Sequence, residues 1–261
     1  MTAPVYLSIA GSDCSAGAGI QADLKAGFAL GCYPLTALTC VVSEVPGKVE
    51  GIVAMEPRFV ADQVRICLQH FPVQAIKTGM LYSPEIVQAV TAELTDFTGP
   101  IVVDPVMIAT AGEPLILQAA IKVYEQSLMP RTTLLTPNLD ELQRLLGTEE
   151  PIRTADELQQ AAITLTRRYN CAVLAKGGHL EGDTCTDILV LKEGTAYRWS
   201  HPRTKNISTH GTGCTLSSAV AAHLAKGHDI IEAVELSLDY ITRAIAHSHK
   251  LGELWAVNHH G

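Results

Sequence analysis

Short β-rich runs alternate with helix-periodic segments along most of the chain, and this alternation constrains the fold more than any single motif. Buried strands of about four to nine residues are predicted at Val5–Ala10, Leu35–Ser43, Ala75–Thr78, Ile101–Met107, Thr133–Thr136 and Ala172–Lys176. Helices are predicted between them at Gln21–Leu30, Pro57–His70, Pro84–Leu94, Leu115–Leu128, Leu139–Leu146 and Thr154–Tyr169. Several of these helices begin at a proline or after a capping residue, such as Ser83, Asn138 or Thr154. Strands joined by helices favour a parallel sheet covered on both faces, so we predict an α/β fold.

The pattern changes after Lys176. A hairpin around Glu193-Gly194 is predicted from Thr186–Lys192 and Ala196–Ser200, and two long helices are expected to finish the chain. The last helix is expected to pack on the sheet, because it places one apolar stripe along its length: Ile231, Val234, Leu238, Ile241 and Ile245. With 261 residues, 47% hydrophobic content and no long linker, a single domain over residues 1–261 is expected.

Charge and cysteine content narrow the class of partner. The net charge is −8, and Lys and Arg are scattered, so no basic face for nucleic acid or an anionic membrane is predicted. The seven cysteines are odd in number and lack C-x-x-C spacing, which favours a reducing cytoplasm and no structural zinc. The first residues lack a targeting pattern, and no apolar run reaches the roughly 18 residues of a membrane span. We therefore expect a cytoplasmic protein that acts on a small molecule.

Polar residues follow the predicted strands at the points where chemistry gathers in open α/β sheets. These residues are Gly11-Ser12-Asp13, Ser43-Glu44, Gly79-Met80, Asp104, Thr136-Pro137-Asn138 and Lys176-Gly177-Gly178-His179. Because the carboxyl ends of parallel strands meet at one edge of the sheet, these segments are the expected wall of a ligand site.

Residues 206–215 (NISTHGTGCT) precede an apolar helix and are the first candidate for an anion site. Gly211 and Gly213 allow a tight turn, and the helix that follows adds unpaired N–H groups and a positive dipole end. This combination predicts a phosphate nest. The same positive end is expected to lower the pKa of the Cys214 thiol. The alternative is a plain glycine-rich turn with Cys214 as a buried filler.

Residues 10–25 (AGSDCSAGAGIQADLK) are expected to form a strand end, a loop of small residues and a helix. Small side chains let a compact polar ligand or an anion approach the backbone closely. The segment is not a Walker A loop, because no Gly-Lys-Ser/Thr follows, and it lacks the G-x-G-x-x-G dinucleotide pattern. The alternative is a close strand-to-helix turn without a ligand.

Three charged residues need partners. Asp104 ends an apolar strand and therefore requires a cation, a metal or hydrogen bonds. Glu141 lies three residues past Asn138, where a capping role competes with binding Mg²⁺ beside Asp104. Lys176 can bind phosphate or simply form a salt bridge. His179 and His210 are expected to make ordinary hydrogen bonds.

Six segments in one order, covering nearly the whole chain, carry a resemblance: IAGSDCSAGAGIQADLK, KTGML, VVDPVM, LLTPNLDE, LAKGGHL and STHGTGCTLSSA. Together they resemble the hydroxymethylpyrimidine kinase / phosphomethylpyrimidine kinase family of thiamine biosynthesis, a branch of the ribokinase-like fold. The resemblance implies one three-layer αβα domain, usually a homodimer. It also implies a Mg-ATP kinase that phosphorylates the hydroxymethyl group of an aminopyrimidine and then the resulting monophosphate.

Residue roles follow from the same resemblance. It implies an anion hole at Gly211, Thr212, Gly213 and Cys214, with Cys214 where most ribokinase relatives have an aspartate base. Asp104 and Glu141 would act around Mg²⁺, and Lys176, Asn138 and Thr212 would bind ATP. The residues implied in pyrimidine binding are Gly11, Ala18, Asp23, Glu44, Met80 and Val106.

Two positions depart from the family pattern. Glu44 stands where the family has a glutamine, and Thr110 where it commonly has a lysine. An ionised carboxylate only accepts hydrogen bonds, whereas an amide also donates, so we hypothesise that Glu44 is protonated or selects a protonated ring.

Phosphoryl transfer needs positioning and charge stabilisation more than a strong base, so the Cys214 thiol can accept the substrate proton late in transfer. Two other functions remain open at this point. A pyridoxal kinase phosphorylates a similar hydroxymethyl group, and a catalytically silent pyrimidine-binding protein would keep the same fold.

Overall fold

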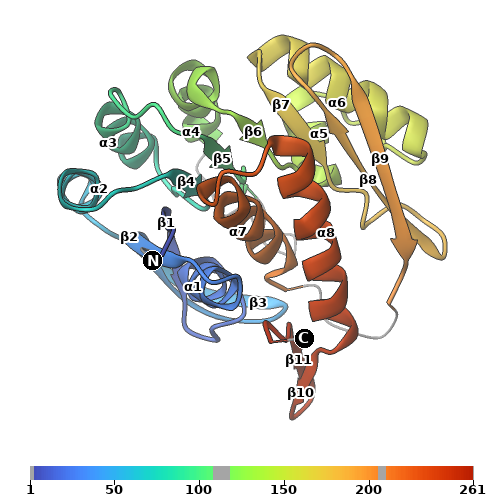
Figure 1. The fold of residues 1–261 in the computed structure, drawn as a ribbon, viewed down its shortest axis with the longest axis horizontal. Helices are drawn as coiled ribbons and strands as arrows, with labels where there is room; N and C mark the ends of the chain where they lie inside the picture. The colour runs from blue at the N-terminus through green and yellow to red at the C-terminus, as the bar shows by residue number, and fades with distance from the viewer. Residues whose placement is uncertain (1–2, 108–117, 205–209, 261) are drawn as a thin grey trace.

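The computed structural model describes residues 3–107, 118–204 and 210–260. Its main sheet has nine strands in the order β3-β2-β1-β4-β5-β6-β7-β8-β9 (Figure 1). The parallel strands are β1 (Val5–Asp13), β2 (Tyr33–Val45), β4 (Ala75–Thr78), β5 (Ile101–Val103), β6 (Leu134–Leu135) and β7 (Ala172–Ala175). The antiparallel strands lie toward the two edges and are β3 (Lys48–Ala54), β8 (Thr184–Val190) and β9 (Ala196–Pro202). The predicted α/β class and the β8–β9 hairpin are confirmed.

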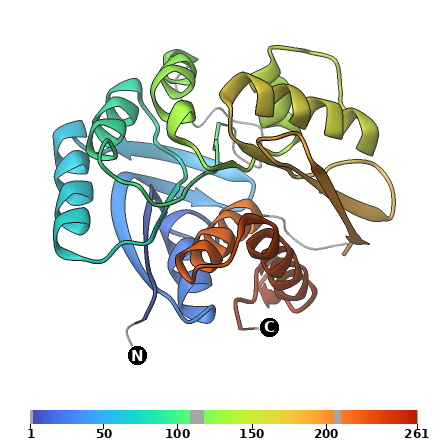
Figure 2. The same cartoon turned by 45° about the horizontal axis from the view of Figure 1, so that its top comes forward.

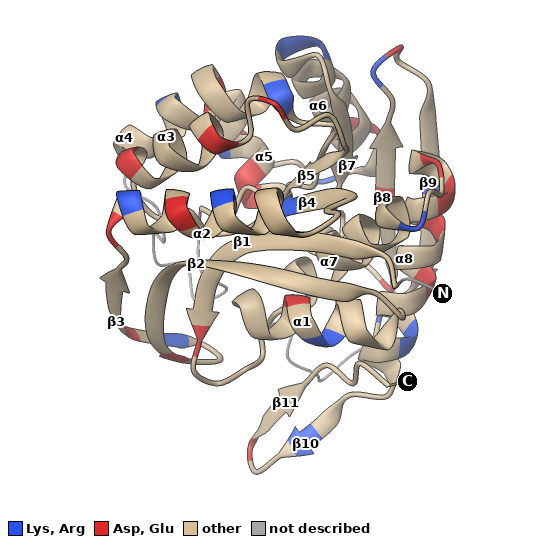
Figure 3. Cartoon of the chain, turned by 60° about the vertical axis from the view of Figure 1, so that its left-hand side comes forward, with Lys and Arg blue, Asp and Glu red and all other residues tan. Residues whose placement is uncertain are grey.

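Helices cover both faces of the sheet (Figures 1 and 2). Those packed over one face are α1 (Gly19–Ala29), α7 (Thr212–Ala225) and α8 (Ile230–Ala246). Those over the other are α2 (Pro57–His70), α3 (Pro84–Glu93), α4 (Gln118–Val123), α5 (Leu139–Leu146) and α6 (Ala155–Tyr169). Figure 3 shows the two helix layers above and below the strands, with both signs of charge spread over the ribbon. The three-layer arrangement is therefore confirmed.

Side-chain alternation explains the two cores. Within β1, Leu7 and Ile9 join the core under α2 to α6, whereas Tyr6 joins the core under α7 and α8. Strand side chains point alternately to opposite faces, so a strand covered on both sides must be apolar at nearly every position. The predicted stripe on α8 packs as expected: Val234, Leu238 and Ile241 lie in the second core.

Several element boundaries differ from the prediction. The fourth predicted strand ends at Val103 rather than Met107, because the chain leaves the ladder at Asp104 and proline follows. The described part of the predicted helix Leu115–Leu128 begins as α4 and continues as a π-helical turn, Tyr124–Leu128, before a 3₁₀ turn at Met129–Arg131. The edge strand β3 and the small hairpin of β10 (His249–Leu251) and β11 (Leu254–Ala256) were not predicted, since no buried alternating run marks them.

The predicted caps are present. Ser83 accepts a hydrogen bond from the backbone of Ile86 at the start of α3. Asn138 and Thr154 each form a capping box with the glutamate three residues later. These caps fix where α5 and α6 begin, and the first of them lies at the functional site.

Candidate active site

A cavity of about 630 Å³ lies where the carboxyl ends of the parallel strands meet the start of α7. Nearly every residue expected to bind ligand lines it: Gly11, Ala18, Glu44, Met80, Asp104, Val106, Asn138, Glu141, Lys176 and Gly211 to Cys214. Asp23 is the exception, because it does not line the cavity. Part of the predicted nest segment, residues 206–209, and Thr110 lie outside the described residues.

The predicted nest is built on the first turn of α7. Gly211 caps this helix in the left-handed region, at φ 79°. A Cβ at this position would lie 1.8 Å from the backbone oxygen of Gly17, so a side chain cannot fit. The first turn of α7 therefore packs directly against the loop after β1 while its N-terminal end faces the cavity.

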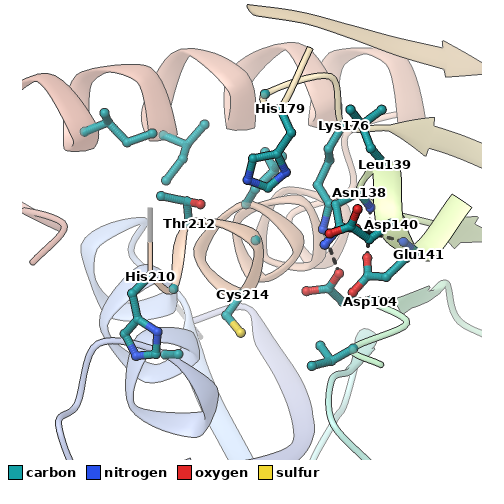
Figure 4. Close-up of a pocket in the computed structure, with 18 of the residues that line it drawn as sticks. Asp104, Asn138, Leu139, Asp140, Glu141, Lys176, His179, His210, Thr212 and Cys214 are labelled. Atoms are coloured by element: carbon teal, nitrogen blue, oxygen red, sulfur yellow. Dashed lines mark hydrogen bonds and ion pairs between the residues drawn. The ribbon is translucent and has the colours of Figure 1, made fainter. Parts of the chain in front are cut away.

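Asp104 satisfies its buried charge with an ion pair and hydrogen bonds. Its Oδ1 lies 2.9 Å from Lys176 Nζ, and Thr136 and Ser217 donate hydroxyl hydrogen bonds to its two oxygens. Burial opposes the charged form, but the ammonium groups of Lys176 and Lys77 outweigh it and lower the pKa of Asp104. Figure 4 shows this pair beside Glu141, opposite Cys214 and His210.

The ion pair also lies close to the nest. A Cβ on Gly213 would be 3.2 Å from Lys176 Nζ and 3.7 Å from Asp104 Oδ2. The missing side chain therefore lets an ammonium and a helix N-terminus approach the same point, which favours an anion with several negative oxygens.

Glu141 combines both roles that the sequence left open. Its carboxylate accepts a hydrogen bond from the backbone of Asn138 at 2.8 Å, which completes the capping box, and it also lines the cavity. Burial raises the pKa of Glu141 to about 8; Lys176 opposes this shift and Asp104 adds to it. Within the described residues, no group of three or more His, Cys, Asp or Glu side chains is placed to hold a metal. Two neighbouring carboxylates nevertheless suit Mg²⁺, which usually keeps waters and takes its other ligands from substrate phosphates.

The expected low pKa of Cys214 is wrong. Burial raises the pKa of the Cys214 thiol to about 12; Lys77 lowers it, while Asp23 and Asp104 raise it. The cost of placing a thiolate among protein groups thus exceeds the attraction of nearby positive charge.

Asp13 connects the two loops, a role that the sequence did not reveal. Its Oδ2 lies 2.9 Å from His210 Nε2, and it accepts backbone hydrogen bonds from Ser15, Gly17 and Ala18. Burial opposes this charge, but the hydrogen bonds from His210 and the loop lower the pKa of Asp13 to about 2. The loop after β1 and the residue before the nest are therefore held by one carboxylate, and the expected hydrogen-bonding role of His210 is confirmed.

Asp23 is a structural group rather than a lining residue. It is fully buried, its carboxylate binds Lys77 Nζ at 2.9 and 3.0 Å, and the hydroxyl groups of Ser8 and Ser218 donate to it. The expectation that Asp23 binds substrate is not supported, because this network occupies both of its oxygens. Asp23 and Lys77 lie 54 positions apart, so the pairing has no local sequence signal.

Glu44 lies in the cavity wall near the end of β2, and Cys14 bridges its backbone. The Cys14 thiol donates to the Glu44 oxygen at 3.2 Å, and the Glu44 N–H donates to the sulfur at 3.4 Å. Burial raises the pKa of Glu44; Asp13 adds to the shift and His210 opposes it. The cavity therefore favours a proton on Glu44 more than bulk water does.

Comparison with known proteins identifies the family. The family model described as phosphomethylpyrimidine kinase matches residues 13–258. The chain belongs to the phosphomethylpyrimidine kinase family. The resemblance drawn from the sequence is thereby confirmed, and membership places the chain among the phosphotransferases.

Individual relatives agree with this placement. The chain is 41% identical to a hydroxymethylpyrimidine/phosphomethylpyrimidine kinase of Streptomyces coelicolor, covering 97% of this chain and 92% of the relative. It is 42% identical to a thiamine biosynthesis bifunctional protein of Geobacter sulfurreducens, of which it spans about half: the match covers 94% of this chain and 50% of that protein.

A solved structure shares the fold closely. The pyridoxal kinase of Staphylococcus aureus in complex with AMP-PCP and pyridoxal matches with a TM-score of 0.89 at 30% identity, covering 100% of this chain and 94% of that one. Among the described residues, every helix is too short or too polar to cross a membrane.

Proposed function

We propose that the chain is a cytoplasmic, ATP-dependent kinase of thiamine biosynthesis. It phosphorylates the hydroxymethyl group of 4-amino-5-hydroxymethyl-2-methylpyrimidine and then converts the monophosphate to the pyrophosphate. The observation that carries this proposal is the position of the Asp104–Lys176 pair against Gly213 in the nest, in the same cavity as Glu44. That arrangement handles phosphoryl charge next to a wall suited to a small polar ring.

The nucleotide would bind on the side of α5 and β7. Lys176 offers a buried ammonium to the phosphates, and Asn138 and Thr212 line the same region of the cavity. Asp104 and Glu141 would hold Mg²⁺, partly through waters. Their closeness raises the pKa of Glu141, and a divalent cation would relieve that unfavourable proximity. When bound, Mg²⁺ neutralises the negative charge of the phosphate oxygens.

The pyrimidine would bind on the side of β1 and β2. Gly11 and Ala18 keep this wall low, and Met80 and Val106 supply apolar surface for an aromatic ring. Glu44 is the hydrogen-bonding group, and the aminopyrimidine offers it an amino donor and a ring nitrogen. A proton shared between carboxyl and ring nitrogen would let both hydrogen bonds form together.

The transfer step uses the nest and the thiol. The substrate hydroxyl oxygen forms a bond to the terminal phosphorus as the bond to the departing diphosphate breaks, and the hydroxyl proton is released. N–H groups at Gly213 and Cys214 would stabilise the moving phosphoryl oxygens. The proton would pass to Cys214 in its thiolate form, which a pKa of about 12 limits to roughly 10⁻⁵ of molecules at pH 7. Transfer to sulfur would therefore come late, when the hydroxyl is most acidic.

We also propose a homodimer formed through the β2–β3 edge. β3 is the outer strand of the sheet, and Val53 on it is 69% exposed. Val41 and Val45 on β2 are also exposed, so apolar side chains gather on an edge with free backbone groups. Val53→Asp should convert a dimer to a monomer in light scattering, and a wild-type monomer at micromolar concentration would refute this assembly.

A pyridoxal kinase is the second candidate, favoured by the likeness to a pyridoxal kinase with pyridoxal bound. The higher identity to relatives of thiamine biosynthesis, 41% and 42% against 30%, supports the first candidate. A silent pyrimidine-binding protein is the third, but the intact set of Asp104, Glu141, Lys176 and nest argues for turnover.

The deciding experiment measures ADP release with four substrates: hydroxymethylpyrimidine, its monophosphate, pyridoxal and pyridoxine. Turnover of the first two, with kcat/KM at least tenfold above the pyridines, supports the proposal. Preference for pyridoxal would replace it with the second candidate. Binding of the pyrimidine by calorimetry without ADP release would leave the silent protein. Lys176→Met is the matched control, because it should abolish any true turnover while the pyrimidine wall stays intact.

A further inference from the structure

An ion pair with no solvent exposure lies behind the nest and has no part in the function proposed so far. Lys77 at the end of β4 and Asp23 on α1 both have completely buried side chains. Asp23 receives both hydrogen bonds described for the Lys77 ammonium, at 2.9 and 3.0 Å. Burying such a pair usually gains little stability over well-packed apolar residues. Its presence so close to a reaction site points to a use beyond packing.

Helix α7 links this pair to Cys214. Ser218 donates its hydroxyl to Asp23 Oδ1 at 2.7 Å, and Ser218 lies four residues after Cys214 on the same helix. Residues four apart share one face of a helix, so the ion pair sits one turn behind the thiol. Gly79, two residues beyond Lys77, lines the gap: a Cβ there would meet Lys77 Nζ at 2.8 Å. The ammonium thus points along the floor of the site and not toward the outer surface.

We propose that Lys77 is a positioning residue for phosphoryl transfer, whose buried ammonium supports negative charge on the Cys214 sulfur as the substrate proton arrives. Asp23, Ser8 and Ser218 hold the lysine in place. The inference rests on the proposed function, since it concerns the thiol that accepts the proton. In the balanced step, the hydroxyl proton moves to the thiolate sulfur, and the resulting thiol later returns that proton to water.

Charged groups face Cys214 from each neighbouring element. Lys77 comes from β4 and favours the thiolate, whereas Asp23 from α1 and Asp104 after β5 disfavour it. Lys176, after β7, also couples to Cys214, and the backbone N–H of Gly19 at the start of α1 hydrogen-bonds the sulfur. Among the groups that act on the thiol, Lys77 is the strongest opponent of burial. Removing it leaves two carboxylates and only the more distant cation pairing with Asp104.

The test measures thiol reactivity directly, without substrate or metal. The rate of iodoacetamide alkylation is followed for each cysteine by peptide mass spectrometry between pH 7 and 10. Lys77→Met removes the charge, and Lys77→Arg keeps it in a larger side chain. Cys14, which is exposed at the cavity mouth, is the internal reference whose rate should not change. Thermal unfolding of each variant is recorded in parallel.

The expected result is that reactivity follows charge and not stability. In Lys77→Met, alkylation of Cys214 should slow about tenfold or more at fixed pH, its profile should move to higher pH, and kcat should fall with little change in the KM for ATP. Lys77→Arg should keep most of the Cys214 reactivity even though overpacking lowers its Tm. If reactivity instead tracks Tm across the two variants, Lys77 is merely structural and the inference fails.

A second variant guards against misfolding of Lys77→Met. Asp23→Asn with Lys77→Met removes both charges together and leaves an amide oxygen for Ser8 and Ser218. It should be more stable than Lys77→Met alone, yet its Cys214 should still alkylate severalfold more slowly than in the wild type. A wild-type rate would overturn the inference. Because alkylation needs no substrate, this outcome is independent of whether the chain phosphorylates the pyrimidine.

Discussion

Replacing Gly211 with alanine should damage both stability and catalysis, because two separate costs meet at this position. The φ of 79° costs a non-glycine residue about 1 kcal/mol. In addition, the new Cβ would lie 1.8 Å from the Gly17 oxygen, so the two loops must move apart. Forcing extra volume into a packed region costs a further ~2 kcal/mol. The expected loss of unfolding free energy is therefore about 3 kcal/mol.

Gly147 is the matched control. It ends α5 in the same left-handed region, at φ 74°, but a Cβ there would meet no atom within 4 Å. Gly147→Ala should therefore lose only the backbone term, about 1 kcal/mol. For a chain of this size, these losses correspond to a fall in Tm of about 2–4 °C for Gly147→Ala and about 6–12 °C for Gly211→Ala.

Catalysis should separate the two variants further. Moving the nest by about 1 Å relative to the loop after β1 can cost about 100-fold in rate. Gly211→Ala should thus lose about that much kcat/KM for the pyrimidine, measured by ADP release well below its Tm, while Gly147→Ala keeps wild-type activity. Equal effects of the two alanines on Tm and on kcat/KM would refute the argument that contact with Gly17 fixes the nest.

Three further predictions follow from the site and the core. Cys214→Ala should lower kcat far more than it weakens ATP binding measured by calorimetry, and equal losses would indicate a merely structural cysteine. Glu44→Gln should change the pH profile of kcat/KM, since it removes a titrating carboxyl whose pKa burial raises, and superimposable profiles would disprove a shared proton. Burial lowers the pKa of His223 to about 4, and neither ring nitrogen has a hydrogen-bond partner among the described residues. A lowered histidine pKa gives stability that is present above pH 6.5 and lost as pH falls toward 4, so about 2 kcal/mol should disappear between pH 7 and 5. Denaturant titrations of His223→Leu should show a smaller loss, and an unchanged pH dependence would contradict this.

Local patterns predicted the fold because the forces that act on them are local. Apolar runs between periodic helices had to form buried parallel strands, and the Ser83, Asn138 and Thr154 caps were readable because each bond spans only three residues. The edge strand β3 escaped prediction because it is largely exposed, so burial left no pattern on its residues. Placement of Asp104, Lys176 and the nest at one cavity followed from the rule for strand ends.

The character of the individual groups depended on contacts that no local pattern records. Asp13 and His210 meet across 197 residues, and Lys77 meets Asp23 on a separate element. Cys214 shows the difference most clearly. The sequence placed its thiol at a helix N-terminus and predicted an acidic group, whereas the structure buries it beside two carboxylates and raises its pKa to about 12.

The sequence by itself determined the layered α/β fold, the family and the residues that gather at the strand ends, since hydrophobic period, caps and glycine spacing are properties of neighbouring residues. Only the tertiary structure decided which carboxylates are paired, which line the cavity and which thiol is hard to ionise. Desolvation and Coulomb interactions depend on distance in space, and the chain sets those distances only when its distant segments pack together.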